Sequence, residues 1–427
     1  MSAAATESVG ALLPRLWRDR AAWSATSDIF AILIAAALPW STSLVAIFAA
    51  AFLVSLLRFP DFMGLLRSLK RPVCGLPVAL FVVAVIGMLW SIAPWSERFY
   101  ALGPAAKLLM LPVMLYHFER SARGVQVFVA FLASCALLMV FSWIVAFDPR
   151  LALKPGAEYG VPVKNYIDQS QEFALCAVAL AYPVVTLLRT KKFRLAALLM
   201  AFALGFVVNM LFVSVSRTAL VTIPVMLAVF ALLHLKWRSI VIIACAMAVL
   251  GVLAWATSPP LRWTTETFLR DYQIYKERNI PTSIGLRLVF WEKSLRFISE
   301  APLFGHGTGS TRALFEEDSV NQFGAAAEVV ANPHNQTLNV AIQWGAIGVV
   351  VLYAMWLVHL LLFRGAGLMT WIGLMAVVQN IFTSLFNSHL FDFTEGWMYV
   401  LGVGIAGGTV LGRRSREAAA ARDRARP

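Results

Sequence analysis

Apolar stretches of about 17 to 25 residues recur along the chain from Asp28 to Leu411. Each is long enough to cross a hydrocarbon core of about 30 Å as an α-helix. The 427 residues are 60% hydrophobic and 14% charged, an apolar excess that a water-soluble domain of this size cannot bury. The run from Leu76 to Trp90 is apolar on every face rather than at alternate residues, which excludes a membrane β-barrel. The sequence therefore predicts an all-α, polytopic membrane protein.

About twelve membrane-spanning helices are expected, separated by charge and turn signals. A segment of about 75 residues lies between the ninth and the tenth, and its mixed composition favours a folded subdomain over a linker. The helices are expected to begin near residues 28, 41, 73, 99, 125, 169, 195, 218, 240, 334, 367 and 396. The predicted divisions are a leader at 1–27, helices one to nine at 28–256, the subdomain at 257–333, helices ten to twelve at 334–411 and a basic tail at 412–427.

The distribution of Lys and Arg predicts the orientation. One alternate set of connections, the leader and the tail are rich in basic residues, whereas the other short connections hold few: Arg98, Arg150, Lys154, Lys164 and Arg217. Because basic residues near span ends resist translocation, we expect both termini in the cytoplasm and residues 257–333 outside. The net charge of +13 then reflects topology, so membrane lipids are expected partners and nucleic acid is not.

No cofactor or metal is predicted. All four cysteines lie in apolar runs, where each is a small apolar side chain, and neither a disulfide framework nor a CxxC site is present. Walker A, GxSxG and HExxH motifs are also missing. The acidic run from Glu316 to Asp318 is better explained as a solvated loop than as a cation site.

Arg217, in the sequence LFVSVSRTALV, is the first candidate for a binding residue. It is expected at the outer start of the eighth helix, where the helix dipole disfavours a cation by about 0.3 to 1 kcal/mol. A bound anion, held by the guanidinium and the free N–H groups of the helix start, would explain this placement. Contact with lipid headgroups is the alternative.

His334 is the second candidate, in the sequence NPHNQTLNV. We expect Asn332 to cap the tenth helix and Pro333 to lie in its first turn, so that His334 also falls in that turn. A helix N-terminus disfavours the imidazolium ion and would keep His334 neutral, able to accept a proton near pH 7. The alternative is a histidine that only bonds a loop carbonyl.

Arg287 is the third candidate, on a predicted helix whose apolar positions Leu288, Trp291, Leu295 and Ile298 form a stripe suited to the membrane surface. Trp291 would anchor this helix at headgroup level and leave the Arg287 guanidinium to reach along the surface. Trp291 and Arg296, further along the helix, are weaker candidates. An ordinary amphipathic surface helix is the alternative.

Lys107 is a further weak candidate, because it falls inside the fourth predicted span. An ammonium within the membrane is costly and is a functional candidate by default.

The segments SRTAL, GLRLVFWEKSLRF followed by PLFGHGTGS, and PHNQTLNVAIQWGAIG together resemble the O-antigen ligase and polymerase superfamily of bacterial lipopolysaccharide assembly. The resemblance implies a C-type glycosyltransferase fold in the bacterial inner membrane with a periplasmic active site. It also implies transfer of a glycan from undecaprenyl pyrophosphate, here to lipid A–core. The family arginines correspond to Arg217 and Arg287, and the HN motif corresponds to His334 and Asn335. Where many relatives carry an acidic residue, this chain has Gln343.

Several functions remain open on this basis. An O-antigen ligase is favoured, because polymerases of the superfamily often have two substantial external loops and here the second, 148–168, is short. An O-antigen polymerase and a protein O-oligosaccharyltransferase share the chemistry. A non-catalytic twelve-helix carrier of lipid-linked glycans belongs to another class, and only Lys107 favours it.

Overall fold

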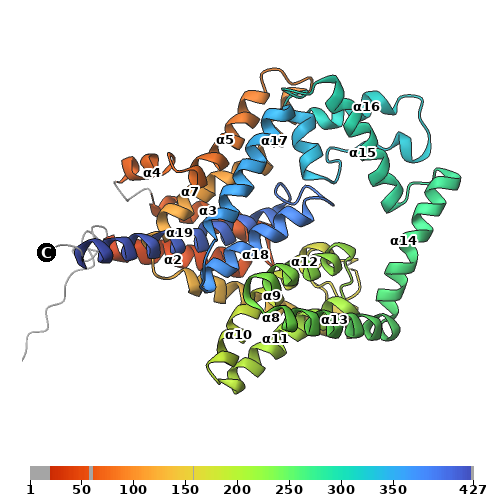
Figure 1. Cartoon of the computed structure of the whole chain (residues 1–427). Helices are drawn as coiled ribbons and strands as arrows, with labels where there is room; N and C mark the ends of the chain where they lie inside the picture. Colours follow the sequence, from red (N-terminus) through yellow and green to blue (C-terminus); the bar gives the residue numbers. More distant parts are fainter. Residues whose placement is uncertain (1–19, 57–60, 157, 425–427) are drawn as a thin grey trace, which may run out of the picture.

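The computed structural model describes residues 20–56, 61–156 and 158–424; helices joined by loops make up this part of the chain, and no strand occurs in it (Figure 1). Helices lie at all twelve expected positions, and most begin within a few residues of the predicted start. They are α2 (Arg20–Ala37), α3 (Thr42–Leu56), α5 (Pro72–Gly87), α6 and α7 (Trp95–Phe118), α8 (Gly124–Phe147), α9 and α10 (Tyr166–Arg189), α11 (Phe193–Phe212), α12 (Arg217–His234), α13 (Trp237–Thr257), α17 (Gln336–Leu362), α18 (Leu368–Thr383) and α19 (Phe393–Arg424). The predicted all-α class is confirmed.

Seven of the described helices are long and apolar enough to cross a membrane, and the bent pair α4 (Phe62–Ser68) and α5 would make eight. That pair turns by 87°, and α2, α3 and α18 contribute shorter apolar stretches. These spans indicate a multi-pass membrane protein. Most of the predicted leader, residues 1–19, lies outside the described residues, and α2 begins at Arg20, eight residues before the expected start.

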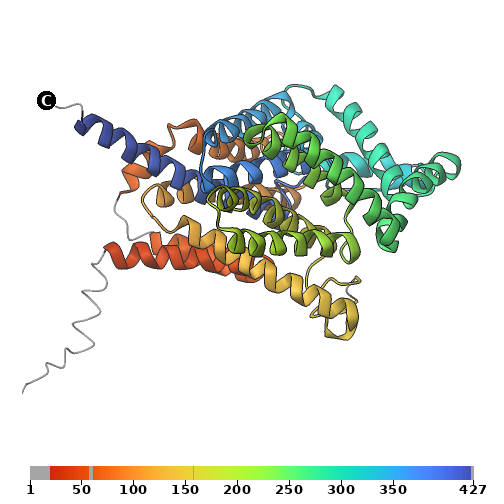
Figure 2. The ribbon, with the colours of Figure 1, turned by 60° about the horizontal axis from the view of Figure 1, so that its bottom comes forward.

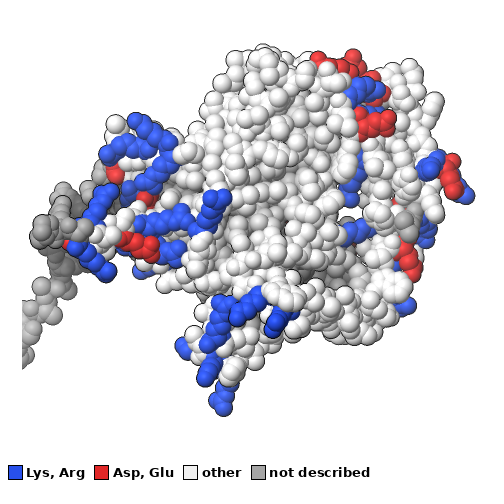
Figure 3. All heavy atoms as spheres, viewed as in Figure 1, with Lys and Arg blue, Asp and Glu red and all other residues white. Residues whose placement is uncertain are grey.

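Charged side chains gather at the ends of the molecule. On the face shown in Figure 3, basic residues cluster near the C-terminus and at the turn between α10 and α11, and a mixed group lies at the opposite end. A broad band between them is almost free of charge, as lipid contact requires. Figures 1 and 2 both place α14 (Pro259–Arg278), α15 (Ser283–Glu300) and α16 (Ser310–Ser319) at the end away from the C-terminus.

The segment between α13 and α17 has its own small core. Val289, Phe290 and Phe297 of α15 pack with Leu314 and Phe315 of α16. The apolar stripe expected on α15 is divided: Leu288 and Leu295 are 38% and 61% exposed, whereas Trp291 and Ile298 are partly buried and pack against this core. The prediction of an amphipathic surface helix was incomplete, because a second apolar face holds α15 against the protein.

Close packing of α19 on α7 joins the C-terminal helix to the bundle. Three glycines at four-residue spacing, Gly404, Gly408 and Gly412, lie on the contact face. A Cβ added to Gly404 would lie 2.7 Å from the Met114 Cβ, and one added to Gly408 would lie 2.7 Å from the Leu115 carbonyl oxygen. Small residues at this spacing allow two helix backbones to approach closely within a membrane.

A kink in α17 positions the end of the molecule that carries α15. Gly345 interrupts α17 with φ 58°, which releases carbonyl groups that a straight helix would use internally. The loop after α15 takes up two of them: the N–H of His306 donates to Ile342 O at 2.8 Å, and that of Gly307 donates to Gln343 O at 2.9 Å. The sequence predicted an unbroken helix here. The kink was missed because Gly345 stands in an apolar run with no proline.

Replacing Gly345 with alanine should destabilise the protein by about 1 to 3 kcal/mol. Alanine would have to adopt the positive φ of this position, and its Cβ would overlap the backbone of Leu303 and Phe304. The measurement is thermal unfolding in detergent, followed by size-exclusion chromatography. Gly251→Ala in α13 is the matched control, since a Cβ added there would meet nothing within 4 Å and alanine favours a helix. Equal melting temperatures for the two variants would contradict the role of the kink.

Candidate functional site

Arg217 is the first residue of α12, as predicted, with Ser216 as the N-cap. Its guanidinium faces the segment between α13 and α17: Nη2 lies 3.4 Å from Asp271 Oδ2 of α14, and the Phe268 ring centroid is 5.9 Å from Cζ. The side chains of Arg217 and Asp271 are 32% and 17% exposed. An anion therefore does meet the guanidinium at this helix start, and it is a carboxylate from the protein itself.

Arg287 lies in the second turn of α15 and is partly buried. Burial lowers the pKa of its guanidinium; the phenol of Tyr166 opposes this effect and the positive charge of Arg217 adds to it. The structure thus brings Arg217 and Arg287 into electrostatic range of each other. Within the described part of the chain, Arg287 has neither an ion pair nor a hydrogen bond from its side chain. A desolvated cation without a partner is a suitable site for an anion.

His334 lies just before α17 rather than in its first turn. The helix begins at Gln336, and Asn335 rather than Asn332 is the N-cap, accepting a hydrogen bond from the Leu338 N–H. The expected capping arrangement was therefore wrong by three residues. Asn332 instead accepts from the backbone N–H of His334, at 2.9 Å, and the His334 backbone is left-handed with φ 55°. A turn closed by Asn332 takes the place of the expected helix start.

The pKa of His334 is lowered, in the direction that the sequence predicted but from a different cause. Burial contributes most, Asn387 opposes it and the charge of Arg287 lowers the pKa further. The ring stacks on Phe290 of α15, with centroids 6.2 Å apart and planes at 28°. Arg287 is therefore close enough to influence both Arg217 and His334, and the three side chains come from three separate segments of the chain.

The loop 384–392, between α18 and α19, supplies residues that the sequence analysis missed. Asn387 Oδ1 lies 2.8 Å from His334 Nδ1, and Asn387 Nδ2 donates to Asp392 Oδ2 at 2.7 Å. Burial lowers the pKa of His389 to about 3, and the charges of Arg287 and His334 contribute. Burial also raises the pKa of Asp392 to about 7, against the effect of Lys107. The loop therefore lies against the same site.

His389, Asp392 and Glu395 bring potential metal ligands within 4.8 Å of one another. Their spacing of three residues in SHLFDFTE was visible in the sequence and could have identified the cluster. A cation is already nearby, because the Lys107 ammonium donates to Phe391 O at 2.9 Å and to the carbonyl of Asp392. Lys107, expected as an intramembrane functional group, thus holds this loop, and we assign no metal to the cluster.

The weaker candidates lie around this site with structural contacts of their own. Arg296 is exposed and pairs with Asp318, so it points to α16 rather than to Arg287. Trp291 packs partly buried against the small core of α15 and α16. Asn335 donates to Leu385 O at 3.1 Å and so ties the start of α17 to the loop 384–392. Gln343 accepts from the Gly309 N–H at 2.8 Å.

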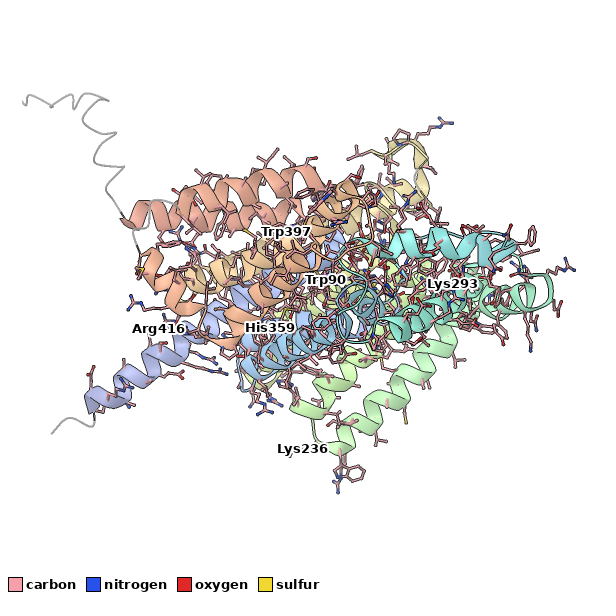
Figure 4. The ribbon with its side chains drawn as sticks, turned by 90° about the horizontal axis from the view of Figure 1, so that it is seen from above. Trp90, Lys236, Lys293, His359, Trp397 and Arg416 are labelled. Carbon is pink, nitrogen blue, oxygen red and sulfur yellow. The ribbon has the colours of Figure 1, made fainter. Side chains whose placement is uncertain are left out.

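The ionisable cluster of Arg217, Arg287 and His334 is formed by the start of α12, α15 and the residues before α17. Lys293 of the same helix α15 marks this end of the molecule in Figure 4, far from Arg416 at the other end. The fold and the cluster define an all-helical, multi-pass membrane protein with basic groups gathered beside a partly buried histidine at one end of its bundle.

Comparisons with known proteins agree with this description. Residues 201–353, which include Arg217, Arg287 and His334, match a family described as O-antigen ligase. The match covers 153 of the 427 residues. The chain is also 27% identical, over 143 residues, to an uncharacterised protein of Haemophilus influenzae. That similarity covers 32% of this chain and 36% of the relative.

Proposed function

We propose that the protein is an O-antigen ligase. It transfers O-antigen polysaccharide from undecaprenyl pyrophosphate to a sugar hydroxyl of lipid A–core, on the periplasmic side of the bacterial inner membrane. The observation that supports the proposal is that Arg287 lies within electrostatic range of both Arg217 and His334, so that two guanidinium groups are near one histidine. The family match over 201–353 supports the same chemistry.

In this mechanism the two arginines bind the pyrophosphate of the donor. Their planar, forked donors suit phosphate oxygens and stabilise the negative charge that grows on the leaving group. Arg287 has no protein partner to give up among the described residues, and Arg217 exchanges Asp271 for the donor phosphate. The two guanidinium charges, which repel each other in the free protein, are both neutralised in the complex.

His334 acts as the general base. The acceptor hydroxyl oxygen forms a bond to the anomeric carbon of the donor glycan, and its proton passes to the imidazole. The bond from that carbon to the pyrophosphate oxygen breaks, and undecaprenyl pyrophosphate leaves with the electron pair. A single displacement inverts the anomeric configuration. The lowered pKa of His334 keeps the imidazole unprotonated before the reaction.

The ligase is favoured over the polymerase because the second external connection, between α8 and α9, is short. The test is to delete the gene that encodes this protein and to analyse the lipopolysaccharide and the lipid-linked intermediates of the cells. Loss of a ligase leaves long polymer on the carrier lipid and bare lipid A–core. Single repeats on the core indicate a polymerase instead. Loss of glycan from an acceptor protein indicates a protein O-oligosaccharyltransferase. Lipid-linked intermediates trapped inside the cell indicate a transporter.

Replacing His334 with glutamine should lower turnover by about 10²- to 10⁴-fold, the contribution of a general base. In the unaltered protein, turnover should fall with decreasing pH at an apparent pKa below 6.5, because burial and Arg287 favour the neutral imidazole. The measurement is transfer of lipid-linked glycan to purified acceptor in detergent, across a pH series from about 5 to about 8 that brackets the ordinary titration range of histidine.

The matched control for this variant is His234→Gln, at the opposite end of α12 from Arg217. It should keep near-normal turnover and the same pH profile. Near-normal turnover of His334→Gln would remove His334 from the mechanism.

Replacing Arg217 or Arg287 with lysine should lower transfer by about 10- to 100-fold, because an ammonium cannot make two parallel bonds to one phosphate. Arg296→Lys is the control: this arginine lies on α15 too, but it pairs with Asp318. Donor affinity and turnover are measured with purified protein. If the Arg217 and Arg287 variants match Arg296→Lys in donor affinity and turnover, the proposal that these two arginines bind pyrophosphate is wrong.

A further inference from the structure

We infer that Asn332 and Asn387 are positioning residues that fix the proton of His334 on Nδ1 and leave the lone pair on Nε2. The inference deepens the proposed function and rests on it, because it says which nitrogen of the base accepts the proton. It is carried by a chain of hydrogen bonds that begins at a group whose role is fixed by its chemistry.

That group is the backbone N–H of His334, which can only donate. It lies 2.9 Å from one terminal atom of Asn332, so this atom is the carbonyl oxygen Oδ1. The Ser388 hydroxyl, 2.7 Å from the same oxygen, donates to it as well. The other terminal atom of Asn332 is therefore the amide nitrogen, and the orientation of this side chain is determined.

The Asn332 amide in turn orients Asn387. Asn332 Nδ2 can only donate, and it lies 3.2 Å from a terminal atom of Asn387, which must then be Oδ1. The Asn387 nitrogen consequently faces Asp392, where it donates to Oδ2 at 2.7 Å. The bonds of Asn387 to Asn332 and to Asp392 are both satisfied in this orientation, whereas the reverse orientation would set the N–H₂ groups of the two asparagines against each other.

The oriented Asn387 decides the tautomer of His334. Nδ1 lies 2.8 Å from the same Asn387 Oδ1, which is an acceptor only, so Nδ1 carries the hydrogen. A neutral imidazole has one N–H, so its second nitrogen, Nε2, holds the lone pair. Nε2 makes no hydrogen bond to the described residues, and it remains available to an incoming hydroxyl.

The local backbone supports the same arrangement. A non-glycine residue in the left-handed region is uncommon, and the Asn332 side chain stabilises it at His334 by closing a two-residue turn. This hydrogen-bond relay runs from His334 through Asn332 and Asn387 to Asp392. Lys107 holds the Asp392 end, because it donates to the carbonyls of Phe391 and Asp392. Two loops, 332–335 and 384–392, thus together fix the tautomer that leaves the lone pair on Nε2.

The direct test measures the tautomer without any substrate. Protein labelled with ¹⁵N-histidine is examined by NMR at mildly alkaline pH, and the His334 signals among the six histidines are assigned by comparison with His334→Gln. We expect the Nδ1–H form in the unaltered protein. Asn387→Leu removes the acceptor and should shift the population towards Nε2–H. An Nε2–H form in the unaltered protein overturns the inference.

A second variant, Asn387→Asp, tests how Asn387 affects turnover. It can still refute the inference if Asn387→Leu does not fold. Asn387→Asp retains an acceptor for both the Asn332 amide and His334 Nδ1, so the Nδ1–H form should persist. Its carboxylate should also raise the apparent pKa of the acid limb of turnover, whereas Asn387→Leu should lose about 10- to 100-fold in turnover. Asn321→Asp, an exposed residue of the same external segment, adds the same charge as a control and should leave that pKa unchanged.

The outcomes separate this inference from the proposed function. If the Nδ1–H tautomer is present but His334→Gln keeps full activity, the proposed function fails and the hydrogen-bond relay stands. If His334→Gln is inactive but Asn387→Asp leaves the acid limb unmoved, the base stands and the positioning role of Asn387 is wrong.

Discussion

The hydrogen bond between His334 and Asn387 joins two segments on which the whole site depends. One is the short stretch before α17, and the other is the loop 384–392 that precedes α19. Because Asn335 also bonds Leu385 and Lys107 bonds Phe391, the loop is held from both sides. These bonds fix the position of the His334 imidazole although neither segment is itself helical, which is the support that the proposed general base needs.

The positively charged residues of the site differ from those at the other end of the molecule in their exposure to solvent. Several basic residues there, such as Arg120, Lys191 and Arg416, are exposed at the surface. Arg287 is partly removed from water, lies near a second guanidinium and depresses the pKa of two histidines. Such an arrangement costs free energy in the free protein, and a diphosphate would remove that cost on binding.

The sequence predicted the helices well because membrane spans are long and uniformly apolar, so the length of each apolar run determines them. It also predicted that Arg217 begins a helix, since the preceding serines and the apolar run after it define the boundary. It did not predict the kink at Gly345 or the turn at Asn332, because both depend on contacts with distant loops. Asn387 was missed for the same reason: nothing local distinguishes it, and its role exists only where 332–334 and 384–392 meet.

The pairing of Arg217 with Asp271 has a consequence for how tightly this arginine is held. Both side chains retain contact with solvent, and ion pairs of this kind contribute only about 0 to 1 kcal/mol. In the proposed function the carboxylate therefore serves as a temporary partner: it holds the guanidinium towards α14 in the free protein and is replaced by the doubly charged pyrophosphate. Since such a pair is screened by salt, the readiness of this exchange varies with the ionic strength around that end of the molecule.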